Sequence, residues 1–126
     1  MTDLVNAFMG VFDPVSFALI TGGTIFGIIF GAIPGLTATL AVILLIPLSY
    51  GLEPTQGISM LVGVYIGGIS GGVVAAVLLG MPGTPSSMVT VLDGFALAKQ
   101  GRAGKALGAG VTANLAGSFI GWLFLI

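Results

Sequence analysis

Long apolar stretches separated by short polar turns make up most of the chain. Three of them, 14–33, 57–81 and 106–126, have the roughly 20 residues that a membrane-spanning helix needs. Two shorter ones, 36–48 and 84–95, follow Pro-Gly pairs and are long enough for only about half of a bilayer core. The pattern predicts an all-α integral membrane protein in which multi-pass helices alternate with broken, re-entrant half-helices.

The two helix breaks share one sequence pattern. "GAIPGLTATL" and "GMPGTPSS" each combine a Pro-Gly pair, which interrupts a helix, with hydroxyl side chains in the first turn of the next helix. In the second break, Thr84 is a favourable helix cap and Pro85 a favourable first helical residue. The candidate site residues are Pro34, Gly35, Thr37, Thr39, Pro82, Gly83, Thr84, Ser86 and Ser87.

A helix that begins at membrane depth presents free N–H groups and about half a positive charge. Such a helix end attracts an anion without a basic side chain, and it must be buried in protein or line a watery cavity. Secondary transporters hold substrates in this way and use freed carbonyl groups for the coupling cation. We therefore expect a carboxylate at the two breaks and a coupling cation at backbone carbonyls near Gly31 and Gly80.

A single Pro-Gly pair in a membrane helix is usually only a bend, and two pairs with hydroxyls after each favour a binding site instead. Asn114, inside the last span, is a further candidate, although a hydrogen bond between helices is the commoner role of such a residue.

Composition narrows the possible function classes. Hydrophobic residues form 56% of the 126 residues and charged residues 6%, and the mean hydropathy is +1.21, so the chain lacks the surface of a soluble domain. It has no cysteine and no histidine, which excludes disulfides, zinc sites and histidine bases within it. A serine hydrolase using Ser86 or Ser87 would have no base in reach, so we expect no enzyme and no cofactor. Without a basic patch, we also expect no nucleic-acid partner.

Charge also predicts the topology of the chain ends. All three basic residues lie within 99–105, so the positive-inside rule places that loop in the cytoplasm. The orientation of residues 1–81 stays open, because it depends on whether 78–95 crosses the bilayer or re-enters it. Residues 1–12 form one apolar helical face, which predicts an interfacial helix; that face consists of Leu4, Val5, Phe8, Met9 and Phe12. The apolar end of the sequence suggests a fragment truncated at its C-terminus.

Glycines spaced by four residues predict helix contact faces. Small residues at this spacing let helix backbones approach closely in lipid, and static packing is a commoner role for them than a sliding interface. The glycines concerned are Gly23, Gly27, Gly31, Gly63, Gly67, Gly71, Gly117 and Gly121.

Four stretches in this order, "GAIPGLTATLAVILLIPLSYGLEP", "LVGVYIGGISGG", "GMPGTPSS" and "LDGFALAKQGRAGKALG", resemble the N-terminal portion of the large membrane subunit of tripartite tricarboxylate transporters, the TctA family. The resemblance covers nearly the whole chain from about residue 20. The family's two Pro-Gly motifs map onto Gly31, Pro34, Gly35, Thr37 and Thr39, and onto residues 82–87. Because the family's permease is several times longer, the chain corresponds to part of the first of two inverted halves.

The resemblance implies a permease in the bacterial inner membrane that takes up tricarboxylates or related carboxylates by symport, driven by an ion gradient, with sodium as the expected cation. It implies two protein partners: a smaller, TctB-like membrane subunit and a periplasmic, TctC-like solute-binding protein. The resemblance also implies an elevator-like movement. The alternative is a structural membrane subunit that only assembles a complex, with kinked helices and no substrate site. That alternative predicts no polar cavity at residues 34–39 or 82–87.

Overall fold

The computed structural model describes residues 9–125, and all regular elements in that range are helices. Three of these helices are long and apolar enough to cross a membrane, and a fourth, shorter one is also apolar. The chain is therefore an all-α membrane protein. Of the predicted interfacial helix, Leu4, Val5 and Phe8 lie outside the described residues, whereas residues 9–11 are helical.

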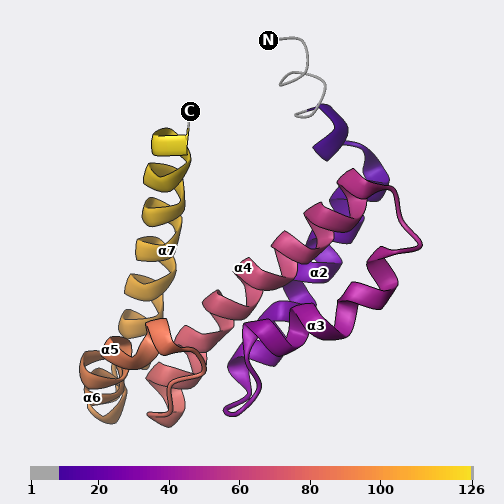
Figure 1. Ribbon diagram of the computed structural model, residues 1–126. Helices are drawn as coiled ribbons and strands as arrows, with labels where there is room; N and C mark the ends of the chain where they lie inside the picture. The colour runs from indigo at the N-terminus through magenta and orange to yellow at the C-terminus, as the bar shows by residue number, and fades with distance from the viewer. Residues whose placement is uncertain (1–8, 126) are drawn as a thin grey trace.

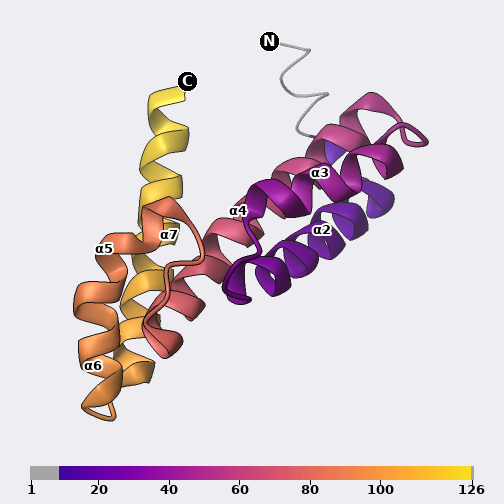
Figure 2. The same cartoon turned by 60° about the horizontal axis from the view of Figure 1, so that its bottom comes forward.

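Helices α2 (Pro14–Ala32) and α4 (Pro54–Leu79) lie side by side and run parallel (Figures 1 and 2). Asp13 starts α2, because its carboxylate accepts a hydrogen bond of 3.2 Å from the backbone N–H of Val15. Gly23, Gly27 and Gly31 of α2 then face positions 60, 64 and 68 of α4 in the same order. A constant offset along both chains is the mark of a parallel pair.

Glycine makes this α2–α4 contact possible. A Cβ atom added to Gly27 would meet the carbonyl oxygen of Val64, and one added to Gly67 would meet that of Thr24. The backbones therefore touch directly, as close packing of small residues in membrane helices allows. The contact also keeps α4 one continuous helix through its glycine-rich centre, because the exposed backbone there is covered by α2.

Helix α3 (Ala38–Ser49) returns alongside α4 and contains Pro47, a residue type that usually ends or kinks a helix. The helix extends two residues beyond this proline. Proline removes only one backbone hydrogen-bond donor. The final turn gains another hydrogen bond, because the Ser49 hydroxyl donates to the carbonyl of Ile46 at 2.7 Å. Ser49 also packs against Gly57 near the start of α4, where an added Cβ would lie 3.2 Å from the Ser49 carbonyl oxygen.

The chain turns back after α4 and returns along the same helix. Gly80 ends α4 in the left-handed conformation (φ 67°), and the next residues turn back along the helix, so that a Cβ on Gly83 would lie 3.0 Å from the Cα of Gly72. A helical segment, residues 85–99, then descends beside α4, with Gly94 against Val77. We call it the return helix. It consists of η1 (Pro85–Ser87), α5 (Met88–Thr90), the π-helical turn η2 (Val91–Phe95) and α6 (Ala96–Lys99).

Helix α7 (Ala103–Leu125) follows a turn at Gly101 (φ 75°) and runs back up beside the return helix (Figure 1). It touches α4 where a Cβ on Gly110 would lie 2.7 Å from the side chain of Val73. By contrast, Gly117 and Gly121 face no neighbour within 4 Å in the described part of the chain. Their predicted contact face is therefore unused within residues 9–125.

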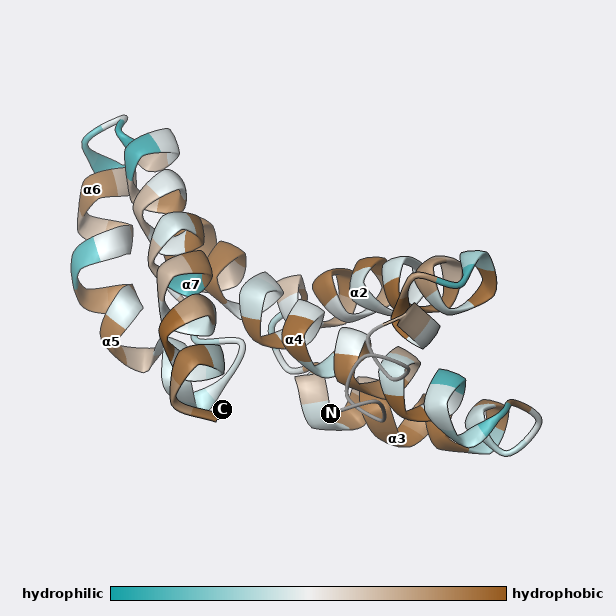
Figure 3. Cartoon of the chain, turned by 90° about the horizontal axis from the view of Figure 1, so that it is seen from above, coloured by the Kyte–Doolittle hydropathy of each residue, from teal (hydrophilic) through white to brown (hydrophobic). Residues whose placement is uncertain are grey.

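The core is built from small residues, and large apolar side chains point outward. Gly, Ala and Val dominate the buried positions, whereas many Ile, Leu and Phe side chains are exposed. Figure 3 shows hydrophilic residues gathered at the turn after α6 and at the turn between α3 and α4, with hydrophobic helices between them. This is the distribution expected of helices that pack against one another within a bilayer.

Candidate functional site

The two Pro-Gly breaks, 48 positions apart in the sequence, meet in space beside the middle of α4. A Cβ on Gly83 would lie 2.5 Å from the carbonyl oxygen of Gly31, the residue near the end of α2. The first residue of α3, Ala38, packs on Gly68 of α4, and Thr84 packs on Gly72, one turn further along. Glycines on α4 thus bring the starts of α3 and of the return helix to the same stretch of one helix.

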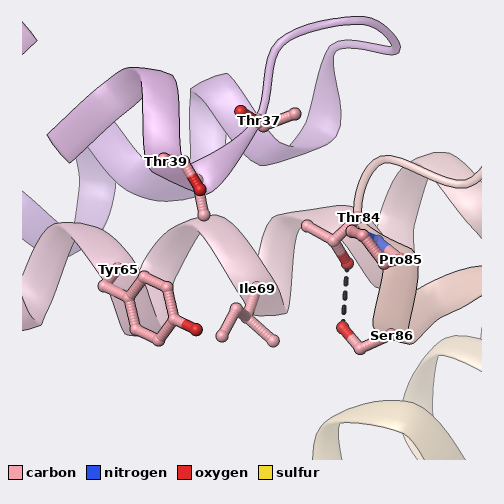
Figure 4. A pocket seen from close by; sticks show the side chains of 8 residues that line it. Thr37, Thr39, Tyr65, Ile69, Thr84, Pro85 and Ser86 are labelled. Carbon is pink, nitrogen blue, oxygen red and sulfur yellow. Dashed lines mark hydrogen bonds between the residues drawn. The ribbon is translucent and has the colours of Figure 1, made fainter. Parts of the chain in front are cut away.

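A cavity of about 380 Å³ lies between these two helix starts and α4 (Figure 4). Its walls are rich in hydroxyl groups and contain no charged side chain among the described residues. The residues that line it are Thr37, Ala38, Thr39, Tyr65, Ile69, Thr84, Pro85 and Ser86. We call it the hydroxyl cavity.

The start of the return helix is held by a reciprocal cap. The Thr84 backbone N–H donates to the Ser87 hydroxyl oxygen at 3.1 Å, and that hydroxyl donates to the Thr84 carbonyl at 2.8 Å. Ser87 is buried and its hydroxyl faces Thr84 rather than the cavity. Ser86 is exposed and lies 3.0 Å from the Thr84 hydroxyl, as the dashed line in Figure 4 marks. Ser87 therefore has a structural role in the cap, whereas Ser86 lies at the cavity wall.

The start of α3 is capped in a simpler way. The Thr37 hydroxyl oxygen accepts a hydrogen bond of 3.2 Å from the backbone N–H of Leu40. Because a hydroxyl can accept and donate at once, the Thr37 O–H is still able to donate to a ligand. Thr39, in the first turn, is exposed and lines the same cavity. Both threonines come from the sequence pattern of the first break.

Tyr65 and Ile69 complete the cavity, and the sequence pattern of the two breaks does not identify them. They lie one turn apart on the face of α4 beneath the start of α3 (Figure 4). Their position in the cavity wall depends on how α3 and the return helix pack against α4. The two residues themselves do not determine that packing. A hydroxyl-bearing aromatic residue near the centre of an apolar span was the one available hint, since tyrosine in membrane helices favours the interfaces.

The other predicted residues shape the backbone or lie elsewhere. Pro34 and Gly35 (φ 93°) form the turn between α2 and α3, and Pro82 lies in the turn before the return helix; none of the three lines the hydroxyl cavity. Of the two carbonyl positions, Gly31 lies beside Gly83 at the junction of the breaks. Gly80 lies instead at the end of α4 against the ring of Phe95. The structure therefore separates these two positions.

Asn114 belongs to a second cavity of about 380 Å³, between α7 and the α2–α4 pair. Its neighbours there include Ile28, Ser70 and Ser118, so this cavity is mostly apolar with a few small polar groups. Asn114 does not line the hydroxyl cavity.

The hydroxyl cavity offers neutral hydrogen-bonding groups, and no charged side chain lines it among the described residues. Hydroxyls and first-turn N–H groups donate hydrogen bonds, and the ends of two helices contribute partial positive charge. Within the described residues, no group of three or more acidic, histidine or cysteine side chains could hold a metal ion. A serine there has no general base beside it, because the lining residues include no histidine, lysine or carboxylate.

A curated relative from Agrobacterium vitis, the uncharacterized 52.8 kDa protein in the TAR-I ttuC' 3'region, is 35% identical over 125 residues. The aligned part is 96% of this chain and 24% of the relative, so the chain spans about a quarter of the relative's length. No solved structure matches. The model of the tripartite tricarboxylate transporter TctA family matches residues 17–126, and the chain therefore belongs to that family.

Proposed function

We propose that this chain forms part of the substrate pathway of a carboxylate permease, and that the hydroxyl cavity binds a carboxylate group of the transported anion. The observation that carries the proposal is the meeting of two hydroxyl-bearing helix starts on one cavity without a charged side chain. Helix ends and hydroxyls bind carboxylates through hydrogen bonds and partial charge, and they release them more readily than a fixed cation would.

The alternative, a structural subunit with kinked helices, is less well supported. It requires no polar cavity at residues 34–39 and 82–87, whereas both segments line one. Close packing of the two breaks would also serve a structural role, since Gly83 touches Gly31 and Gly72. Such packing does not require hydroxyl-bearing residues in the wall of a cavity, so the cavity favours the transport function.

The remaining parts of the proposal concern the coupling ion, the partners and the membrane. Uptake is a secondary process, by symport with sodium, and the Gly31 carbonyl beside the junction is the better placed of the two carbonyl positions. The protein acts in the bacterial inner membrane with a TctB-like membrane subunit and a TctC-like periplasmic binding protein. The whole transporter comprises two inverted halves, of which this chain contributes part of the first.

The proposed orientation combines the fold with the expected cytoplasmic side of the basic loop. With residues 99–105 in the cytoplasm, the end of α4 lies on the cytoplasmic side, because the return helix re-enters. The start of α2, at Asp13, and the turn at Glu53 then face the periplasm. The single acidic residues at those two positions fit this assignment, because neither end carries a basic residue.

The test uses the absence of cysteine in this chain. In the full-length transporter, with any other cysteines replaced, Ser86→Cys places a thiol at the cavity wall. We expect the variant to retain citrate uptake and to react with a membrane-impermeant thiol reagent from at least one side. Citrate with sodium should slow the labelling. Ser87→Cys is the matched control, because Ser87 is buried within the cap and should react at least tenfold more slowly.

Two results would count against the proposal. If Ser86→Cys takes up citrate normally but does not react from either side, the second break is a packing element. If it reacts at the same rate with and without citrate, succinate and sodium, the cavity is open to water but does not bind these carboxylates.

A further inference from the structure

Tyr65 is an unusual residue for its place in the fold. It lies near the centre of the 26-residue helix α4, and its side chain is 51% exposed. Its hydroxyl makes no hydrogen bond to the described residues, although tyrosine hydroxyls removed from bulk water usually find a partner. Tyr50, the other tyrosine, lies at the end of α3 beside the polar turn, 83% exposed, which is the ordinary interfacial position.

The hydroxyl cavity gives Tyr65 a distinct position relative to the other donors. Positions 65, 69 and 72 fall on one face of α4, and positions 65 and 72 are about 10 Å apart along the helix axis. Thr84 packs on Gly72, at one end of this line, and Tyr65 lies at the other. Between them, Ile69 forms an apolar floor (Figure 4).

The Tyr65 hydroxyl is therefore set apart from the hydroxyls of the second break. The Thr84 and Ser86 hydroxyls lie at one end of the line along α4, and the Tyr65 hydroxyl lies at the other, separated by an aliphatic side chain. Thr37 and Thr39 line the same cavity from the start of α3. This arrangement matches an anion with two charged groups joined by a short carbon backbone. A cavity of about 380 Å³ has room for such a molecule together with bound water.

We propose that Tyr65 determines specificity, and that its hydroxyl donates a hydrogen bond to a second carboxylate of the substrate, distal to the one at Thr84 and Ser86. The inference rests on the proposed function, since it assumes that a carboxylate occupies the hydroxyl cavity. Tyr65 thereby distinguishes anions with two or more carboxylates from monocarboxylates. A site that hydrogen-bonds a substrate group discriminates strongly against an analogue that lacks it.

The experiment measures protection of Ser86→Cys in the purified full-length transporter by three anions. Citrate and succinate carry carboxylates at both ends, and butyrate has the four-carbon chain of succinate with a methyl group at one end. The concentration that halves the labelling rate is measured with Tyr65 present and in the Tyr65→Phe variant. This change removes one oxygen atom and keeps the ring.

In Tyr65→Phe we expect the half-protecting concentrations of citrate and succinate to rise about tenfold, because a hydrogen bond to a charged group is lost. The value for butyrate should change less than twofold. Tyr50→Phe is the matched control, and it should change none of the three values, because Tyr50 does not line the cavity.

The outcomes separate the two proposals. If no anion protects Ser86→Cys when Tyr65 is present, the proposed function fails. If citrate or succinate protects, but Tyr65→Phe leaves both values unchanged or raises the butyrate value equally, the carboxylate site stands and the role of Tyr65 is refuted. Unchanged basal labelling without any anion will show that Tyr65→Phe has not altered access to the cavity.

Discussion

At the scale of single residues, the cap at the second break has a measurable consequence. Ser87→Ala removes the three hydrogen bonds that its hydroxyl makes with Thr84 and leaves a buried N–H without its acceptor. A lost cap costs about 1–2 kcal/mol. We expect amide hydrogen exchange in the segment 82–90 to accelerate about tenfold or more, as mass spectrometry of the full-length transporter can measure.

Ser86→Ala serves as the control for this variant. Ser86 is exposed and interacts only with the Thr84 hydroxyl among the described residues, so its loss should change exchange in the same segment by less than threefold. Equal acceleration in both variants would mean that the reciprocal cap does not order the start of the return helix.

The sequence allows some of these residues to be identified and not others. Thr37 and Thr84 follow Pro-Gly pairs, and the geometry of a helix start dictates what their hydroxyls do. Ser86 and Ser87 are adjacent and chemically identical, so only the fold reveals which one faces the cavity. Tyr65 is harder still, because its role depends on helices that begin 27 residues before it and 20 residues after it.

At the scale of secondary-structure elements, the α2–α4 contact depends on glycine at defined positions. In Gly27→Ala, the new Cβ meets the carbonyl oxygen of Val64, a backbone atom that cannot move without shifting α4. Overpacking of this kind costs about 1–3 kcal/mol. We expect the full-length transporter to unfold at a lower concentration of sodium dodecyl sulfate, as circular dichroism during a titration can measure.

Gly22→Ala is the matched control on the same helix, because no atom lies within 4 Å of an added Cβ there in the described structure. Its unfolding midpoint should stay the same or rise slightly, since alanine favours a helix over glycine. A similar loss in both variants would indicate a general sensitivity of α2 to alanine rather than a close contact at Gly27.

Element boundaries show what local sequence determines. Asp13 with Pro14, and Thr84 with Pro85, mark helix starts through capping chemistry that acts within three residues. Pro47 suggests a helix end, yet tertiary packing and the Ser49 hydroxyl hold two further residues in the helix. The π-helical turn at Val91–Phe95 has no local signature, and the packing of Gly94 on Val77 accompanies it.

At the scale of the whole molecule, hydropathy predicts the number of spans but leaves the path of 78–95 open. An apolar segment of this length fits either a crossing or a hairpin, and the choice rests on long-range contacts. Gly83 decides it, because its position against Gly72 and Gly31 requires the chain to turn back toward the middle of α4. If the basic loop lies in the cytoplasm, as the positive-inside rule predicts, the membrane sides of all the described helices follow from it.

Single cysteines at three exposed turns can test this topology. Met81→Cys and Gln100→Cys flank the re-entrant segment, and Gly51→Cys lies in the turn between α3 and α4. In the cysteine-free full-length transporter, we expect Met81→Cys and Gln100→Cys to react with an impermeant reagent only in inside-out vesicles, and Gly51→Cys only in right-side-out vesicles. If 85–99 crossed the bilayer, Met81→Cys and Gln100→Cys would react from opposite sides. Whether these two variants react from the same side therefore shows whether residues 85–99 cross the bilayer. This result does not depend on which side carries the basic loop.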